Sequence, residues 1–269
     1  MKNILKKDFF ITYKSKYWWV LLIIVAIFVS LFTTIKYNQS SFFADNSMSN
    51  VADNSFVVGQ TNNTVFSYIE TMICSDVLIM FSSIFTVMIV LQDFQNGFIK
   101  NIWINIDKKY NYIFSKLIII ALFVLTTFLL TILIVFMLDK FFFKFDQIGN
   151  FNKFFSMLLK QFFLHTAFLS VILLMSIVFR KILIVVIATI VYLAFGQPLL
   201  YSAINLLVNK LFKIAENFEI GKYLLFGNIE RTRMAVSETD SIRAILIAAV
   251  CLFISQILSY WFIKNKDII

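Results

Sequence analysis

The sequence predicts an all-α membrane protein, with six transmembrane helices in a single transmembrane domain over residues 1–269. Of these residues, 60% are hydrophobic and only 14% are charged, whereas soluble domains are about half apolar and about a quarter charged. Six apolar stretches each approach or exceed the ~20 residues that cross ~30 Å of hydrocarbon as a helix. Outer-membrane strands would instead give alternating segments of about 10 residues, a pattern that the unbroken run 117–138 excludes.

The six predicted spans occupy residues 17–35, 71–91, 117–138, 162–179, 182–207 and 244–262. The first follows a basic stretch, as the apolar part of a secretion signal would. No small-residue cleavage site comes after it, so we expect it to be retained as a span. The third is apolar on every face apart from three threonines. No connection between spans is long enough for a globular domain.

The fifth predicted span is the longest and is interrupted at Gly196-Gln197-Pro198. Proline removes a backbone donor and clashes with the preceding turn. One outcome is a single kinked helix. The other is a helix that ends near Phe195, with residues 199–207 bending back as a short re-entrant segment that protein or water must cover.

Basic residues predict the orientation of the chain. The tails and even-numbered connections hold 13 Lys and Arg in 50 residues, and the odd-numbered connections hold 11 in 94. Both termini are therefore expected to be cytoplasmic. The net charge of +9 lies beside membrane ends, where anionic lipid explains it without nucleic acid. Twenty lysines against four arginines, with abundant Phe, Ile and Asn, are typical of AT-rich bacteria and indicate a bacterial plasma membrane.

Only Asp76 and His165 are ionisable within the predicted spans. Both are expected near an outer interface, where Asp76 reaches headgroup water and His165 is neutral and hydrogen-bonded, although an intramembrane charge can also mark a transport route. Cys74 and Cys251 lack metal-ligand spacing and are expected in the core. No catalytic constellation and no glycine-rich phosphate loop is present in the sequence, so we expect neither enzymatic activity nor ATP hydrolysis by this chain.

Residues 92–116 form the most informative cytoplasmic connection. At 100° per residue, the stretch 94–108 places Phe94, Phe98, Ile102 and Trp103 on one side, and mainly Lys, Asn and Asp on the other. This pattern predicts an amphipathic helix. Such a helix either lies in the headgroup layer or docks a cytoplasmic partner, and periodicity alone leaves both open.

The run Asp93-Phe94-Gln95-Asn96-Gly97, followed by Lys109 and Ser115-Lys116, resembles the signature of type-2 ATP-binding-cassette exporter permeases. In that family an acidic residue stands four before a glycine, a basic residue about twelve after it and a lysine about nineteen after it. Three features depart from the family pattern: Gln95 replaces a second acid, the proline before the basic residue is missing, and lysine stands where arginine is usual. The aromatic, basic and acidic ending at 260–267 is similar as well.

The resemblance implies an amino-terminal interfacial helix, a cytoplasmic coupling helix and an external re-entrant segment between the fifth and sixth spans. It also implies two copies of a cytoplasmic ATPase subunit, which carry ATP and Mg, and a second permease, identical or homologous. Surrounding membrane lipids complete the expected partners, and this chain itself is expected to bind no cofactor. The residues assigned to ATPase coupling are Asp93, Phe94, Gly97, Phe98, Ile102, Trp103, Lys109 and Lys116.

We expect the transported cargo to be amphipathic or apolar, because almost no ionisable side chain lines the predicted spans. Permeases of this appearance in such bacteria export peptides or confer immunity to antimicrobial peptides, and we favour peptide export. Candidate residues of the substrate route are Asp76, Gln197 and Pro198. The alternatives are a secondary transporter or channel that works without an ATPase, and an immunity permease that removes an antimicrobial peptide from the membrane.

Overall fold

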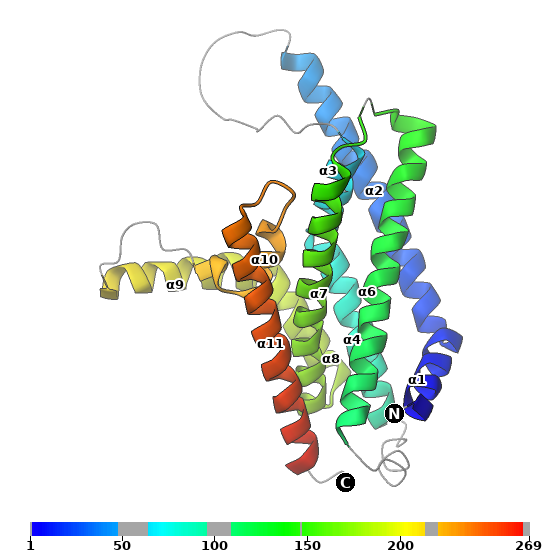
Figure 1. The fold of residues 1–269 in the computed structure, drawn as a ribbon, viewed down its shortest axis with the longest axis vertical. Helices are drawn as coiled ribbons and strands as arrows, with labels where there is room; N and C mark the ends of the chain where they lie inside the picture. The colour runs from blue at the N-terminus through cyan, green and yellow to red at the C-terminus, as the bar shows by residue number, and fades with distance from the viewer. Residues whose placement is uncertain (1, 48–63, 96–108, 146, 213–219, 266–269) are drawn as a thin grey trace.

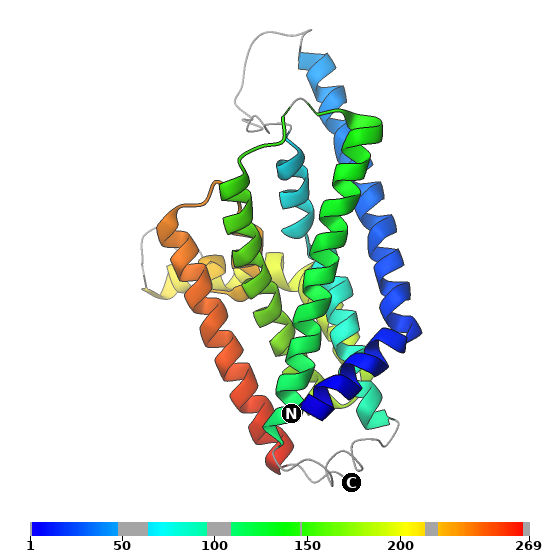
Figure 2. The same cartoon turned by 45° about the vertical axis from the view of Figure 1, so that its right-hand side comes forward.

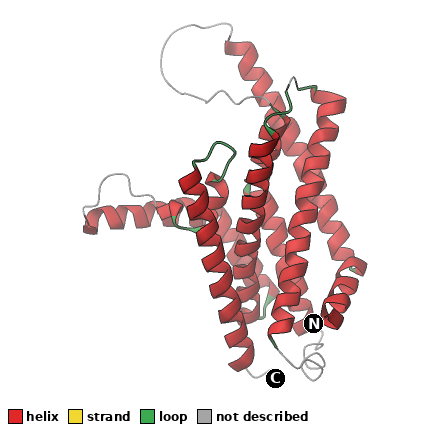
Figure 3. Cartoon of the chain, viewed as in Figure 1, coloured by secondary structure: helices red, strands yellow, loops and turns green. Residues whose placement is uncertain are grey.

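The structure is a computed structural model that describes residues 2–47, 64–95, 109–145, 147–212 and 220–265. These residues form helices joined by short loops (Figure 3). The α-helices are α1 Lys2–Lys14, α2 Lys16–Ser47, α3 Val65–Ile73, α4 Asp76–Gln95, α6 Tyr110–Leu138, α7 Phe151–Phe179, α8 Ile182–Val191, α9 Gln197–Phe212, α10 Leu225–Arg231 and α11 Glu238–Asn265. Two π-helical turns, η1 Asp139–Phe143 and η2 Tyr192–Gly196, and the 3₁₀ turn η3 Ile220–Lys222 complete them.

Within the described residues, five helices are long and apolar enough to cross a membrane, and there are six candidate spans if a bent pair of helices is counted as one span. The five are Lys16–Asn38, Asp76–Phe94, Tyr110–Phe143, Phe151–Phe179 and Glu238–Asn265, and the bent pair is Ile182–Gly196 with Tyr201–Val208. The predicted all-α, multi-span fold is therefore confirmed. Figure 1 shows both termini at one end of the bundle, called here the terminal end, and the opposite end is called the far end.

The second predicted span is interrupted, and other predicted spans are parts of longer helices. The second span, placed at 71–91, crosses a break between α3 and α4, where the Ser75 hydroxyl bonds the Met72 carbonyl at 2.6 Å and Asp76 begins a new helix. Helices α6 and α7, which contain the third and fourth predicted spans, begin at Tyr110 and Phe151, ahead of the apolar stretches. The predicted spans start just after Lys116 and Gln161, because hydropathy treats these polar residues as solvated. Both side chains are instead buried inside the helical bundle with polar partners.

The predicted break in the fifth span is confirmed. The helix axis bends by 56° between Ile182–Gly196 and Tyr201–Val208. The π-helical turn η2 ends at Gly196, where a Cβ atom would approach the Tyr192 ring to 2.9 Å, and Pro198 follows in the first turn of α9. In Figures 1 and 2, α9 runs across the direction of the bundle. Backbone chemistry at Gly196 and Pro198 therefore redirects the chain.

Helices α4 and α7 form the centre of the bundle, because 67% and 61% of their most apolar stretches are buried, against 28% for α2 and 22% for α11. Helix α11 packs closely along α7 through a row of small side chains. The buried members of this row are Ser241, Ala244, Ala248, Ser255 and Ser259. Small residues allow two helix backbones to approach closely in a membrane, and Ser255 adds a 2.6 Å hydrogen bond to Ser170 of α7.

The segment between α9 and α11 is held against the bundle by specific hydrogen bonds. Gln161 of α7 donates to the carbonyls of Ile229, at 2.7 Å, and Thr232, at 2.8 Å. Glu70 of α3 accepts the backbone N–H of Met234 at 2.5 Å. The fully buried Phe226 packs against rings of α7 and η2. These contacts make α10 part of the packed interior.

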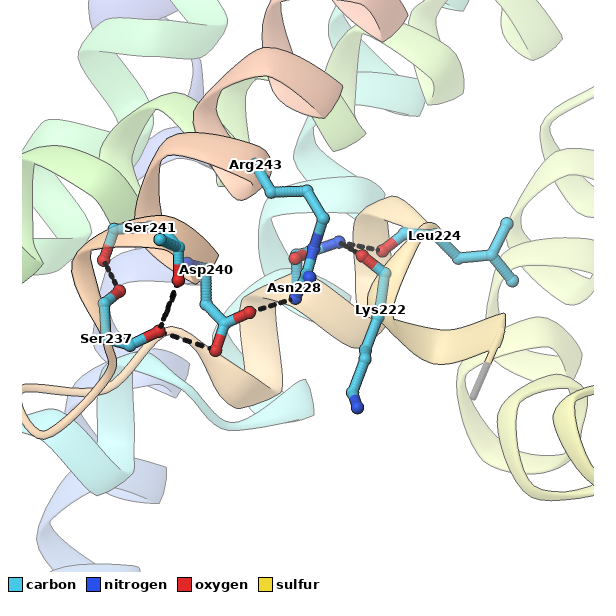
Figure 4. Close-up of polar contacts among 8 residues, drawn as sticks. Lys222, Leu224, Asn228, Ser237, Asp240, Ser241 and Arg243 are labelled. Carbon is cyan, nitrogen blue, oxygen red and sulfur yellow. Dashed lines mark hydrogen bonds and ion pairs between the residues drawn. The ribbon is translucent and has the colours of Figure 1, made fainter. Parts of the chain in front are cut away.

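Side-chain contacts also shape the turn that leads into α10. Asn228 donates to the carbonyls of Lys222, at 3.0 Å, and Leu224, at 2.8 Å, which closes the turn (Figure 4). Beside it, the Asp240 carboxylate pairs with Arg243 at 2.6 Å and accepts the Ser237 hydroxyl at 2.8 Å. These bonds fix the turn before α10 and the first turn of α11, and the two helices contact each other.

Candidate functional site at the terminal end

Three charged side chains from three helices meet in the interior near the terminal end. Lys116 of α6 lies 2.7 Å from Asp93 of α4 and 3.4 Å from Asp8 of α1, measured from Nζ to the nearest carboxylate oxygen. Their side chains are only 4%, 7% and 2% exposed. This group, called here the charge cluster, joins α1, α4 and α6.

Neighbouring hydroxyls complete the charge cluster. Ser115 donates to Oδ2 of Asp8 at 2.5 Å, and the fully buried Tyr112 donates to Oδ2 of Asp93 at 3.2 Å. The Lys116 ammonium lies 5.4 Å from the centre of the Tyr112 ring. Because both carboxylates accept bonds from α6, the first two turns of that helix hold α1 and the end of α4 together.

The local sequence explains how the three helices reach this point. Asp8 and Thr12 are one helical turn apart on the buried face of α1, and the Thr12 hydroxyl bonds the Asp8 carbonyl at 2.7 Å. Phe9, Phe10 and Tyr13 on the other faces are more than half exposed. The polar side of α1 thus packs inward and its aromatic side faces outward, which suits a helix lying at an apolar–polar boundary.

A second contact lies close to the charge cluster in the sequence. The Arg180 guanidinium lies 5.3 Å from the centre of the Phe94 ring, within cation–π range. Arg180 caps α7 in a left-handed conformation, with φ of 53°, so the chain turns sharply there before α8. Phe94 therefore connects the end of α4 to the α7–α8 turn.

The structure brings together the first and last charged residues of the signature. Asp93 and Lys116 form the closest ion pair of the charge cluster. Lys109 stands at the start of α6, two turns before Lys116. Phe94 lies in the last turn of α4. The other assigned coupling residues lie outside the described residues, and with them most of the predicted amphipathic helix: Gly97, Phe98, Ile102 and Trp103.

The two ionisable residues of the predicted spans lie in different environments. Asp76 is half-buried and is the first residue of α4. At this position the positive end of the helix dipole stabilises a carboxylate. His165 lies midway along α7 and is almost completely buried inside the bundle. Its Nδ1–H donates to the Gln161 carbonyl at 2.9 Å, so the expected hydrogen bond is present.

The remaining predicted residues of a substrate route are Gln197 and Pro198. They form the start of α9 and coincide with the bend, while Asp76 starts a different helix. A route through these residues stays a prediction. Cys74 and Cys251 are free thiols, Cys74 buried and Cys251 partly buried. Within the described part of the chain, His, Cys, Asp and Glu side chains do not gather into a group of three that could hold a metal ion.

Sequence reasoning missed the contribution of Asp8. It is the only acidic residue between Lys2 and Lys16, in a segment otherwise rich in lysine. A lone carboxylate in a basic helix is a signal that it has an internal partner, because lysines alone would suffice for contact with anionic lipid. The partner, Lys116, lies 108 residues away in the sequence, so only folding reveals the pair.

The fold and the charge cluster define a multi-pass α-helical membrane protein with an ionic connection between its amino-terminal helix and two of its spans. The family model "Protein of unknown function (DUF2705)" matches residues 21–269. The chain therefore belongs to the DUF2705 family. Among curated proteins, none matches the chain.

Proposed function

We propose that this protein is the membrane-spanning permease subunit of a bacterial ATP-driven exporter of the ATP-binding-cassette type. The observation that carries the proposal is the charge cluster. Asp93 and Lys116, which carry the resemblance to type-2 permeases, form a buried ion pair. The Lys116 ammonium also pairs with Asp8 of the amino-terminal helix. Such permeases grip their ATPase through the amino-terminal helix and the first cytoplasmic connection, which Asp93 and Lys116 bracket.

The mechanism follows from the rigidity of buried ionic contacts. A force applied to α1 or to residues 96–108 would reach α4 and α6 through Lys116, because both carboxylates bind the same ammonium group. ATP-driven closure of two ATPase subunits would then tilt these spans together and change access to a route between two permeases. In this proposal ATP and Mg bind only to the ATPase subunits.

We propose amphipathic peptides as the cargo. The described spans are apolar, and their buried polar groups are mainly hydroxyls that bond to their own helix carbonyls, as Thr86 and Thr131 do. Spans of this composition suit amphipathic molecules better than hydrated ions or sugars. The proposal places both termini in the cytoplasm, on the basis of the distribution of Lys and Arg.

Copurification of the tagged chain with an ATP-binding-cassette ATPase encoded beside it tests the proposal. The double variant Phe98→Asp with Ile102→Asp should abolish association, because carboxylates cannot be buried in a packed protein interface without partners. The matched variant Lys100→Gln with Lys108→Gln should leave association nearly unchanged, because it removes only solvated or lipid-facing charge. An aspartate variant that still copurifies with a stimulated ATPase and still exports would contradict the coupling role.

A further inference from the structure

A groove of about 440 Å³ lies between α7 and α11, on the half of α7 nearer the far end. Its apolar wall is a row along α7 formed by Phe151, Phe155, Leu159 and Phe163, all of them about half exposed or more, and Ile245 faces them from α11. A second row along α7 is polar, and it consists of Asn152, Ser156 and Lys160. Residues four apart lie on one line of a helix, so each row is continuous. The groove therefore offers an apolar and a polar side to one occupant.

Lys160 is the only charged side chain that lines the groove. Its Nζ donates to the Ser241 hydroxyl of α11 at 2.9 Å, and that hydroxyl donates onward to the Ser237 carbonyl (Figure 4 shows this second bond). In the described ranges, no carboxylate lies within ion-pair distance of Lys160. The nearby acid Asp240 is paired with Arg243 instead. A partly buried ammonium group at a membrane boundary calls for an anionic partner.

The depth of Lys160 places it where phospholipid phosphates lie. It precedes Phe179, the last residue of α7, by 19 residues, which is about 28 Å along a helix. The hydrocarbon core of a bilayer is about 30 Å thick. Arg180 and Lys181 follow Phe179 directly and mark the opposite boundary. Lys160 therefore lies at one edge of the hydrocarbon, with Asn152 and Ser156 beyond that edge and Phe163 inside it.

We propose that this groove binds one anionic phospholipid. The phosphate contacts the Lys160 ammonium, the polar headgroup lies along Ser156 and Asn152, and an acyl chain descends between Phe163 and Ile245. Charge complementarity selects an anionic headgroup, since the lining carries one cation and no acid. The lipid would thereby bridge α7 and α11. Lipid binding at this groove does not depend on the proposed exporter function.

Lipid titration of the purified protein in a neutral detergent tests this site. Phosphatidylglycerol should bind in native mass spectra and raise the thermal unfolding temperature more than phosphatidylcholine does. Lys160→Gln should weaken phosphatidylglycerol binding about fivefold, the effect of losing one lysine contact at about 1 kcal/mol. Lys153→Gln, which changes an exposed lysine on the same helix, should leave the binding unchanged.

Ile245→Trp provides a second variant that keeps the charge and fills the groove. It should reduce phosphatidylglycerol binding even if Lys160→Gln does not fold. Equal effects of phosphatidylcholine and phosphatidylglycerol, or unchanged binding in both groove variants, would overturn the proposal. Stabilisation by inorganic phosphate equal to that by phosphatidylglycerol would also overturn it, because the site would then recognise a free anion.

Discussion

Replacing Lys116 by methionine removes the only cation of the charge cluster and keeps the length of the side chain. Asp8 and Asp93 would remain buried at 2% and 7% exposure without a positive partner. Methionine cannot donate a hydrogen bond to either carboxylate. We therefore expect the contact between α1 and the bundle to weaken and the whole protein to lose stability.

The distances set the size of the effect. With an effective dielectric constant of about 20, the Lys116–Asp93 attraction at 2.7 Å is worth about 6 kcal/mol and the Lys116–Asp8 attraction at 3.4 Å about 5 kcal/mol. Desolvation and the repulsion between the two carboxylates oppose these gross values. Removal of one partner from a buried ion pair typically costs about 3–5 kcal/mol, and we expect a loss of that size.

Unfolding in mixed micelles of increasing SDS content, followed by circular dichroism, measures the change. Lys6→Met is the matched control, because Lys6 is an exposed lysine on α1. Asp93→Asn should destabilise more than Asp8→Asn, since Asp93 is the closer partner of Lys116. Equal stability of Lys116→Met and Lys6→Met, or a larger effect of Asp8→Asn than of Asp93→Asn, would refute this reasoning.

Gly227→Ala should destabilise the protein by about 2 kcal/mol or more in thermal unfolding, because the new Cβ would lie 2.3 Å from the Gly221 carbonyl oxygen. The control Gly221→Ala should be nearly neutral, because its Cβ would meet the Tyr201 ring at 3.5 Å. Equal effects of the two substitutions would contradict this prediction. Burial raises the pKa of the Cys74 thiol to about 12. In a Cys251→Ser background, Cys74 should therefore react slowly with maleimide from pH 7 to 9, whereas the reaction of an ordinary thiol of pKa about 8.5 accelerates over this range. Fast labelling of the folded protein would disprove this prediction. In a cysteine-free background, Ile148→Cys at the far end should be labelled from outside intact cells and Lys264→Cys at the terminal end should not; the reverse pattern would invert the predicted orientation.

The pattern of apolar residues was sufficient to predict the membrane spans but not where the helices begin and end. Apolar runs of ~20 residues predict spans because an unpaired backbone cannot cross hydrocarbon. The same hydropathy gave apolar stretches that start at residues 117 and 162, whereas helices α6 and α7 begin at Tyr110 and Phe151, because hydropathy treats Lys116 and Gln161 as solvated. Their burial depends on partners from other helices. The bend after Gly196 was predictable, because proline and glycine act on the local backbone.

The sequence by itself determined that this chain crosses a membrane several times, that its fifth span is broken near Gly196, and that Asp93 and Lys116 stand at the spacing of a known permease signature. Only the tertiary structure decided that Lys116 pairs with both Asp8 and Asp93, that His165 lies in the middle of α7, and that Gln161 binds two carbonyls at the end of α10. Span formation depends on the local balance between apolar transfer and backbone hydrogen bonding, which adjacent residues reveal. The pairing of buried polar groups depends on residues far apart in the chain, and helix packing alone sets which of them meet.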